Sequence, residues 1–128
     1  MAIHESGEDY LEAILILSKE QGYVRSIDVA GYLEVSKPSV SRAMSILRAD
    51  GYLDMMSTGE LRLTESGLEV AERMYERHRL LTEYLVAIGV EQDIAAEDAC
   101  RIEHIISEQT FTCIREFASR FLREDAEK

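Results

Sequence analysis

The stretch SIDVAGYLEVSKPSVSRAMSILRADGYLDMMSTGELRLT, residues 26–64, decides the fold of this chain. Two short segments within it, residues 27–34 and 37–50, have the spacing of apolar side chains that is typical of helices. We expect Ser36 to be the N-cap of the second helix, and Pro38 fits its first turn, where a missing N–H is tolerated. Two helices joined by so tight a turn predict a helix-turn-helix.

The ends of this stretch complete the pattern. We expect Ser26 to cap the first of the two helices and Gly51 to follow the second. Residues 52–56 and 60–64 then form two strand-like runs around a Ser-Thr-Gly turn, which predicts a β-hairpin. Helices followed by a hairpin are the order of a winged helix-turn-helix.

Helical patterns also lie on both sides of the stretch. They cover residues 7–20, 65–88 (capped by Thr64), 93–107 and 109–123. We therefore expect a mainly α chain, with a winged helix-turn-helix and its small β-hairpin wing over residues 1–64. A second, helical domain is expected over residues 65–128.

Composition excludes several classes of protein. The longest apolar run, Ala13–Leu17, is far shorter than the roughly 20 residues of a membrane span, and the N-terminus lacks a signal-peptide pattern. We therefore expect a cytoplasmic protein without a membrane partner. In a reducing cytosol Cys100 and Cys113 are expected to be thiols rather than a disulfide. Cys113 lies among Phe111, Ile114 and Phe117, which predicts a small core residue.

The charge is unevenly distributed. The formal net charge is −11, which by itself argues against nucleic acid, because binding phosphates requires Lys and Arg. Between Ser36 and Thr64, however, there are four basic and three acidic residues, so this segment has a local charge of +1 and the rest of the chain carries −12. A bound cation would offset part of that acidic excess.

Cys100, Glu103 and His104 are the constellation that suggests chemistry. At spacings i, i+3 and i+4 they lie on one face of a helix and offer a thiolate, a carboxylate and an imidazole. The same spacing is also compatible with a core cysteine, a solvated glutamate and a buried histidine. From these three residues alone, the metal-site and structural interpretations are equally good.

Three further residues favour the metal site. Asp9 and Glu12 are at i, i+3 on the first predicted helix, and His78 interrupts an apolar seam of the helix over 65–88. Separately, each has an ordinary explanation, as a solvated helix start or a hydrogen-bonded core histidine. Together with the first three they give six donors from three helices, and mixed carboxylate and imidazole donors suit Mn, Fe or Co.

Four runs of sequence carry a family resemblance. They are EDYLEAI (8–14), VSKPSVSRAMSILRADGYL (35–53), ERHRLL (76–81) and DACRIEH (98–104). In content and order they resemble the family of the diphtheria toxin repressor and the manganese transport repressor, from about Gly7 to Phe121. The resemblance implies a homodimeric bacterial repressor with a DNA-binding winged helix, a helical dimerisation domain, and Mn(II) or Fe(II) as co-repressor.

The resemblance also implies a ligand set of mixed type. The residues that match ligands of the manganese branch are Asp9, Glu12, His78, Glu103 and His104. Cys100 departs from that branch, which has glutamate there, and matches the iron branch. Conversely, the iron branch has methionine at the position of Asp9. Two positions of the iron branch's ancillary site hold Thr82 and Ala96, which argues against that second site. The length matches the two-domain form of the family, or a truncation of the three-domain form.

The predicted recognition helix and wing supply the candidate DNA contacts. They are Ser36, Lys37, Pro38, Ser39, Ser41, Arg42 and Thr58. The serine hydroxyls can donate to phosphates, and the two cations can reach phosphates or a guanine edge. A contact of Pro38 with a thymine methyl follows from the resemblance. Thr58, at the tip of the wing, is placed to contact the DNA backbone.

These observations predict a metal-dependent transcriptional repressor of metal-homeostasis genes rather than an enzyme. One or two ions per subunit, Mn(II) or Fe(II), would order a homodimer for binding to double-stranded operator DNA. The main alternative is a metal-independent winged-helix regulator that senses a small molecule. A zinc protease, suggested by C-x-x-E-H, has the wrong first ligand, and a purely structural dimerisation module does not explain the polar recognition helix.

Overall fold

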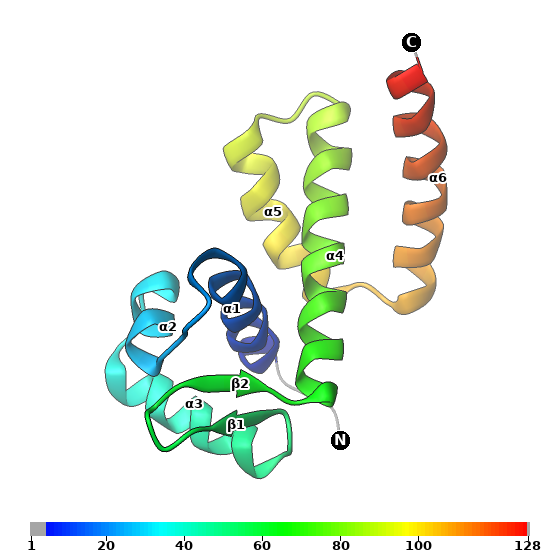
Figure 1. Cartoon of the computed structure of the whole chain (residues 1–128). Helices are drawn as coiled ribbons and strands as arrows, with labels where there is room; N and C mark the ends of the chain where they lie inside the picture. Colours follow the sequence, from blue (N-terminus) through cyan, green and yellow to red (C-terminus); the bar gives the residue numbers. More distant parts are fainter. Residues whose placement is uncertain (1–4, 128) are drawn as a thin grey trace. The chain divides into compact units, whose positions relative to one another are not determined.

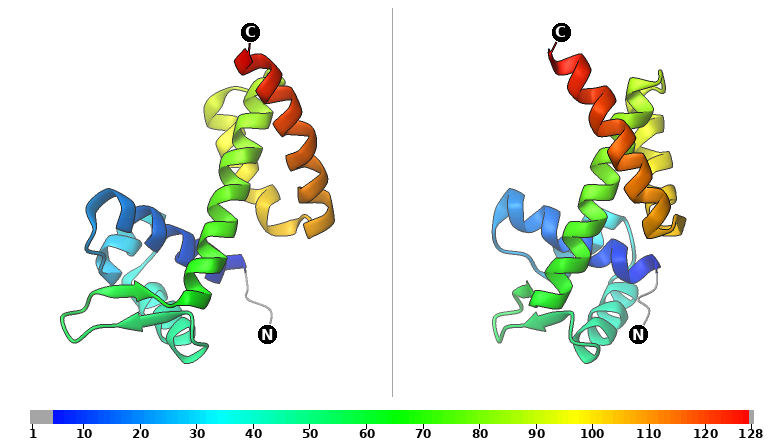
Figure 2. Two further views of the ribbon diagram at one scale, coloured as in Figure 1. Left: turned by 45° about the vertical axis from the view of Figure 1, so that its right-hand side comes forward. Right: turned by 90° about the vertical axis from the view of Figure 1, so that its right-hand side faces the viewer.

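A computed structural model describes residues 5–127 and shows a mainly α protein (Figure 1). In chain order the elements are α1 (Glu5–Gln21), α2 (Ser26–Leu33), α3 (Lys37–Ala49), β1 (Leu53–Met55), β2 (Leu61–Leu63), α4 (Glu65–Ala87), α5 (Gln92–Ile105) and α6 (Glu108–Glu127). The chain divides into two compact units after Met74, and α4 continues through this boundary without interruption (Figure 2). The predicted fold class is confirmed.

The first unit is a three-helix cluster with a hairpin. Helices α1, α2 and α3 contact one another, β1 packs on α3, and β2 packs on α1. The core side chains include Leu11, Ile14, Val29, Val40 and Met44, all at most 1% exposed. Helix α1 is buried on all sides from Tyr10 to Leu15, whereas α3 buries one face and leaves the other available to solvent.

Ser36 caps α3 as predicted. Its Oγ accepts a hydrogen bond from the Ser39 backbone N–H at 3.3 Å, and Pro38 lies in the first turn. The predicted cap at Ser26 is wrong, because α2 already includes Ser26 and Arg25 is at the N-cap position. The Asp28 carboxylate accepts a hydrogen bond from the Arg25 backbone N–H at 2.9 Å. The acid three residues after the N-cap thus satisfies a backbone N–H that has no partner within the helix.

The wing is an antiparallel hairpin whose strands are shorter than predicted. Leu53 pairs with Leu63, and Met55 pairs with Leu61. The ladder is continued beyond the strands by single bonds, from Met56 N–H to the Glu60 carbonyl and from Thr64 N–H to the Tyr52 carbonyl. The Leu61 N–H also donates to the Val24 carbonyl at 2.8 Å, which ties the hairpin to the segment before α2.

The second unit is built from the C-terminal part of α4 together with α5 and α6. Leu81, Ala99 and Phe111 form its buried centre, with Ile102 and Ile114 partly buried against them. Helix α6 continues to Glu127, four residues beyond the predicted end. No helix in the described part of the chain combines the length and hydropathy required to cross a membrane.

One prediction for α6 is wrong. Cys113 is exposed, not a core residue, and Phe117 beside it is 61% exposed. Over residues 108–120, α6 buries Phe111 and Ala118, which lie seven residues apart, so the buried stripe of this part of the helix is narrow. Cys100 and Cys113 are both thiols, as expected.

Thr64 caps α4 as predicted, and Gly67 explains how closely the start of α4 approaches the wing. The Gly67 N–H donates to Thr64 Oγ1 at 3.1 Å, and that hydroxyl donates to the Gly51 carbonyl at 2.7 Å. A Cβ at Gly67 would overlap the backbone carbonyl of Tyr52, whereas a Cβ at the helical Gly31 would meet nothing.

We predict opposite effects of alanine at these two glycines. Gly67→Ala forces backbone apart and should lower the free energy of unfolding by roughly 1–3 kcal/mol. Gly31→Ala should raise it by about 0.5–1 kcal/mol, because alanine is the better helix former. Urea unfolding of both variants checks this, and a Gly67→Ala variant as stable as the parent would contradict the observed approach.

Candidate metal centre

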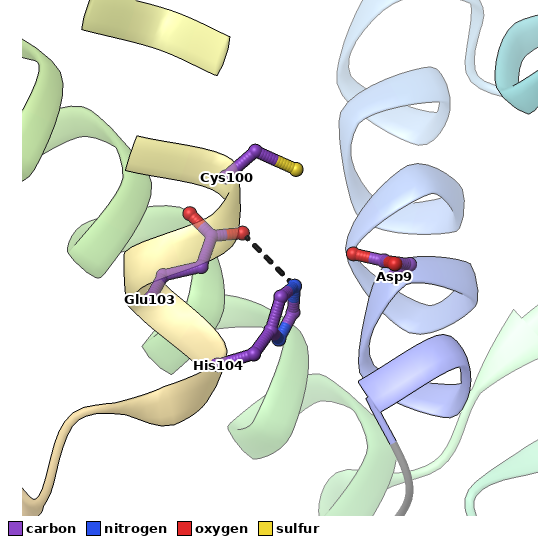
Figure 3. Close-up of side chains that lie close together, drawn as sticks. All are labelled: Asp9, Cys100, Glu103 and His104. Atoms are coloured by element: carbon purple, nitrogen blue, oxygen red, sulfur yellow. Dashed lines mark ion pairs between the residues drawn. The ribbon is translucent and has the colours of Figure 1, made fainter. Parts of the chain in front are cut away.

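Cys100, Glu103 and His104 occupy consecutive turns of α5, as their spacing predicted (Figure 3). The helix is fixed in the second unit by small side chains, because Ala95 and Ala99 are fully buried. Glu103 continues the same buried stripe one turn further on, and Cys100 and His104 each follow one residue after a member of it. Cys100 is exposed and Glu103 is buried, and the side chain of His104 is 1% exposed.

The three side chains lie close enough to share one ion. Their Sγ, carboxylate oxygen and imidazole nitrogen all lie within 4.8 Å of one another. An ion at about 2.0–2.3 Å from each ligand holds opposite ligands roughly 4–4.6 Å apart. The spacing on α5 therefore fits a single divalent cation with little adjustment.

Glu103 is the chemically unusual member. Its side chain is 0% exposed, and His78 Nδ1 on α4 lies 3.0 Å from Oε2. The other oxygen, Oε1, is 3.4 Å from His104 Nε2 and accepts no hydrogen bond within the part of the chain that the structure describes. A buried carboxylate oxygen without a donor is costly, and a bound cation would satisfy it.

The structure thus brings together Cys100, Glu103 and His104, and it places a fourth predicted ligand, His78, in contact with Glu103. His78, Cys100, Glu103 and His104 all belong to the second unit. Asp9 and Glu12 belong to α1 of the first unit, where they lie one turn apart; Figure 3 draws Asp9 on that helix. Asp9 is half-buried, and Glu12, at 8% exposed, is buried. A buried acid is unusual in a helix of this kind and marks Glu12 as more than a solvated helix start.

The two positions of the ancillary site contain no suitable donor. The Thr82 hydroxyl donates to the His78 carbonyl at 2.7 Å and is therefore used within α4. Ala96 has no donor atom in its side chain. The expectation that this version of a second site is missing remains a prediction.

The candidate DNA contacts lie on solvent-exposed positions of the first unit. Ser36, Lys37, Pro38, Ser39, Ser41, Arg42 and Thr58 are all exposed. On α3 these residues lie between and around the buried positions Val40, Met44 and Leu47 and point to solvent. Ser36 is engaged as the helix cap, so its hydroxyl has a structural role independent of any DNA.

Two residues at the wing were missed by the sequence analysis. The Tyr23 hydroxyl donates to the Thr58 carbonyl at 3.3 Å, and Arg25 Nη2 donates to the Tyr23 hydroxyl at 3.3 Å. The Arg25 guanidinium also lies 5.2 Å from the centre of the Tyr23 ring. Tyr23 and Arg25 flank the buried Val24, an alternation that could have marked this exposed pair.

Comparison with known families accounts for nearly the whole chain. Residues 2–60 match the N-terminal DNA-binding domain of iron-dependent repressors, and residues 64–126 match their metal-binding and dimerisation domain. The transcriptional regulator MntR of Escherichia coli O157:H7 is 34% identical over 88% of this chain and 73% of its own length. The HTH-type transcriptional regulator MntR of Bacillus subtilis is 36% identical over 96% of this chain and 87% of its own.

Solved structures agree. A manganese-dependent transcriptional repressor in complex with manganese matches with a TM-score of 0.81 and 30% identity over 88% of this chain and 52% of that one. IdeR of T. acidophilum matches with a TM-score of 0.74 and 29% identity over 91% and 54%. This chain spans about half the length of these two solved structures.

We predict that Glu103→Gln and His104→Ala weaken metal binding. The first replaces an anionic donor with a neutral amide and the second removes an imidazole, so the affinity for Mn(II) should fall at least about 100-fold, equivalent to about 2.7 kcal/mol. Competition against a chromogenic chelator measures this. Glu97→Gln is the matched control, because Glu97 is an exposed acid of the same helix that pairs with Arg101 at 3.4 Å. Full Mn(II) affinity in Glu103→Gln would refute the assigned site.

Proposed function

This chain belongs to the family of iron-dependent repressors, and on that premise we propose that it represses transcription when a divalent cation joins its two units. The relatives are transcriptional regulators, not enzymes. The proposed division of labour places DNA binding in residues 1–64 and metal binding with dimerisation in residues 65–128. The proposed setting is the cytoplasm, where operator DNA and a metal pool are both available.

The observation that carries the proposal is the buried Glu103 carboxylate with an oxygen that accepts no hydrogen bond from the described residues. Burial excludes water from this oxygen, so a bound cation is the partner that it favours. Cys100 and His104 offer a thiolate and an imidazole within 4.8 Å of it, and His78 contacts its other oxygen. The proposed ligands from the first unit are Asp9 and Glu12.

A bridge between units explains how metal could control DNA. Carboxylates gathered at one place repel one another without a cation, and the chain as a whole carries a net charge of −11. An ion held by both units would remove this repulsion and reduce their relative motion. In a homodimer this fixes the spacing of two recognition helices, which must match half-sites about one helical turn, roughly 34 Å, apart. DNA then favours the metal-bound state.

The donor set leaves two ions in competition. The thiolate of Cys100 is a soft ligand and favours Fe(II), whereas the carboxylates of Asp9 and Glu12 are hard and favour Mn(II). We propose Mn(II) or Fe(II) as co-repressor, with one or two ions per subunit. The genes under control would then be those of metal homeostasis.

The second unit has the surface expected of a dimerisation domain. Ile88, Ile94, Ile105 and Phe117 are between 48% and 76% exposed. Apolar side chains of this size favour burial against a second copy, with each contributing roughly 1.5–3 kcal/mol when fully buried. This supports a homodimer.

The proposed DNA contacts use the exposed side of α3 and the wing. Ser39, Ser41, Lys37 and Arg42 would reach phosphates or base edges, and Pro38 would contact a thymine methyl. Tyr23 and Arg25 would support the wing tip through the Thr58 carbonyl. The local charge of +1 predicts weak non-specific binding and a shallow dependence on salt.

We predict that tight DNA binding requires the metal. With a duplex selected from a random pool in the presence of Mn(II), removing the ion with chelator should weaken binding at least about 10-fold, equivalent to about 1.4 kcal/mol. Fluorescence anisotropy measures this, and Mn(II), Fe(II), Co(II) and Zn(II) can be ranked in the same assay. Equal DNA affinity with and without metal would favour the regulator that senses a small molecule.

Two variants separate the two activities. Lys37→Ala combined with Arg42→Ala should lose DNA binding and retain the Mn(II) affinity of the parent. Arg73→Ala combined with Arg120→Ala, which removes two exposed cations from α4 and α6, controls for the change in net charge and should bind DNA within about threefold of the parent. Loss of Mn(II) binding in the double variant would show that the units do not divide the work as proposed.

A further inference from the structure

Arg77 is a buried cation for which the proposed function has no role yet. It precedes the proposed ligand His78 on α4, and it is only 6% exposed. Arginine is almost never buried to this degree unless it is paired. Its partners therefore indicate what it does.

The contacts of Arg77 lie in the second unit, at the end of α5 and the start of α6. Nη1 donates to the Glu103 carbonyl at 3.0 Å and to the Ile106 carbonyl at 3.4 Å. Nη2 donates to the Glu108 carboxylate at 2.7 Å. The guanidinium lies 5.1 Å from the centre of the Phe111 ring on α6. One side chain of α4 thus contacts both other helices of the unit.

The contacts with carbonyls amount to a C-terminal cap supplied by another helix. The last carbonyls of a helix have no partner within it and form the negative end of its dipole, where a cation is favourable. Helix α5 ends at Ile105, and Ile106 is its C-cap residue. The carboxylate of Glu108 pairs with the buried guanidinium, and this ion pair offsets the cost of removing the positive charge from water.

Adjacent residues of α4 therefore hold Glu103 at two points. Arg77 holds its backbone carbonyl, and His78 contacts its carboxylate at 3.0 Å. The last turn of α5 carries both Glu103 and His104. Fixing this turn fixes the direction in which both donors point.

We infer that Arg77 is a positioning residue of the metal centre, which holds the last turn of α5 so that Glu103 and His104 are arranged before an ion arrives. The inference rests on the proposed metal site. Without Arg77 the terminal turn would fray, and binding would have to order it, which lowers affinity without removing any ligand.

The chain offers a matched control in Arg115. This residue of α6 pairs with Glu76 of α4 at 3.2 Å and lies 5.7 Å from the centre of the same Phe111 ring. Arg115→Met therefore removes an ion pair between helices and a cation–ring contact, as Arg77→Met does. Only Arg77→Met removes the contacts with the carbonyls of α5.

The first measurement needs no metal. Hydrogen–deuterium exchange of the metal-free protein should be at least about 10-fold faster at the amides of residues 103–106 in Arg77→Met than in the parent. Arg115→Met should leave these amides unchanged. Equal exchange in the parent and in Arg77→Met would overturn the inference, whatever the metal affinity proves to be.

The second measurement is the affinity for Mn(II) by chelator competition. We expect a loss of at least about 10-fold in Arg77→Met and less than about twofold in Arg115→Met, with Arg77→Lys recovering part of the loss because it keeps the charge but not the fork of donors. Glu108→Gln, which keeps Arg77 but removes its counter-charge, should lie between parent and Arg77→Met, and it serves if Arg77→Met does not fold. Equal losses in Arg77→Met and Arg115→Met would mean general destabilisation and would contradict the inference. If the parent protein binds no Mn(II) while Arg77→Met still shows the faster exchange, the proposed function is refuted, and Arg77 is then only a cap of helix α5.

Discussion

The buried carboxylate of Glu103 is the constraint on which the rest of the second unit depends. It is fully enclosed, one oxygen meets His78 and the other accepts no hydrogen bond among the described residues. An isolated ionised carboxylate would not be stable in such a place. The groups around Glu103 are accordingly ones that favour a negative charge. Two imidazoles lie beside its carboxylate, and the guanidinium of Arg77 donates to its backbone carbonyl.

The same constraint gives a reason for two units instead of one. The donors of the second unit offer an ion at most four ligands, and an octahedral ion takes about six. The first unit carries Asp9 and Glu12 on α1, and that helix packs against the helix-turn-helix. If these two acids complete the site, ordering the ion also orders the DNA-binding unit. Metal sensing would then need no separate path between a metal site and the DNA-binding unit, because the ion would itself bind to both units.

Local features of this chain were predictable from sequence, and long-range ones were not. The cap at Ser36, the hairpin after Gly51 and the shared face of Cys100, Glu103 and His104 follow from turn chemistry and helical period. Ser26 was misassigned because Asp28 accepts a hydrogen bond from the backbone N–H of Arg25, three residues earlier, and this makes Arg25 the N-cap. Cys113 was misassigned because its apolar neighbours predict a wider buried stripe than the one that α6 buries in this chain. Arg77 and the Tyr23–Arg25 pair act through partners up to 35 residues away, and no periodicity marks such contacts.

The most direct test of the central claim is the Mn(II) affinity of the full chain measured with and without saturating DNA. If a single ion couples the two units, DNA must strengthen Mn(II) binding by the same factor by which Mn(II) strengthens DNA binding, because the coupling free energy is reciprocal. The account predicts a factor of at least about 10 in both directions. An Mn(II) affinity that is unchanged by DNA would contradict it.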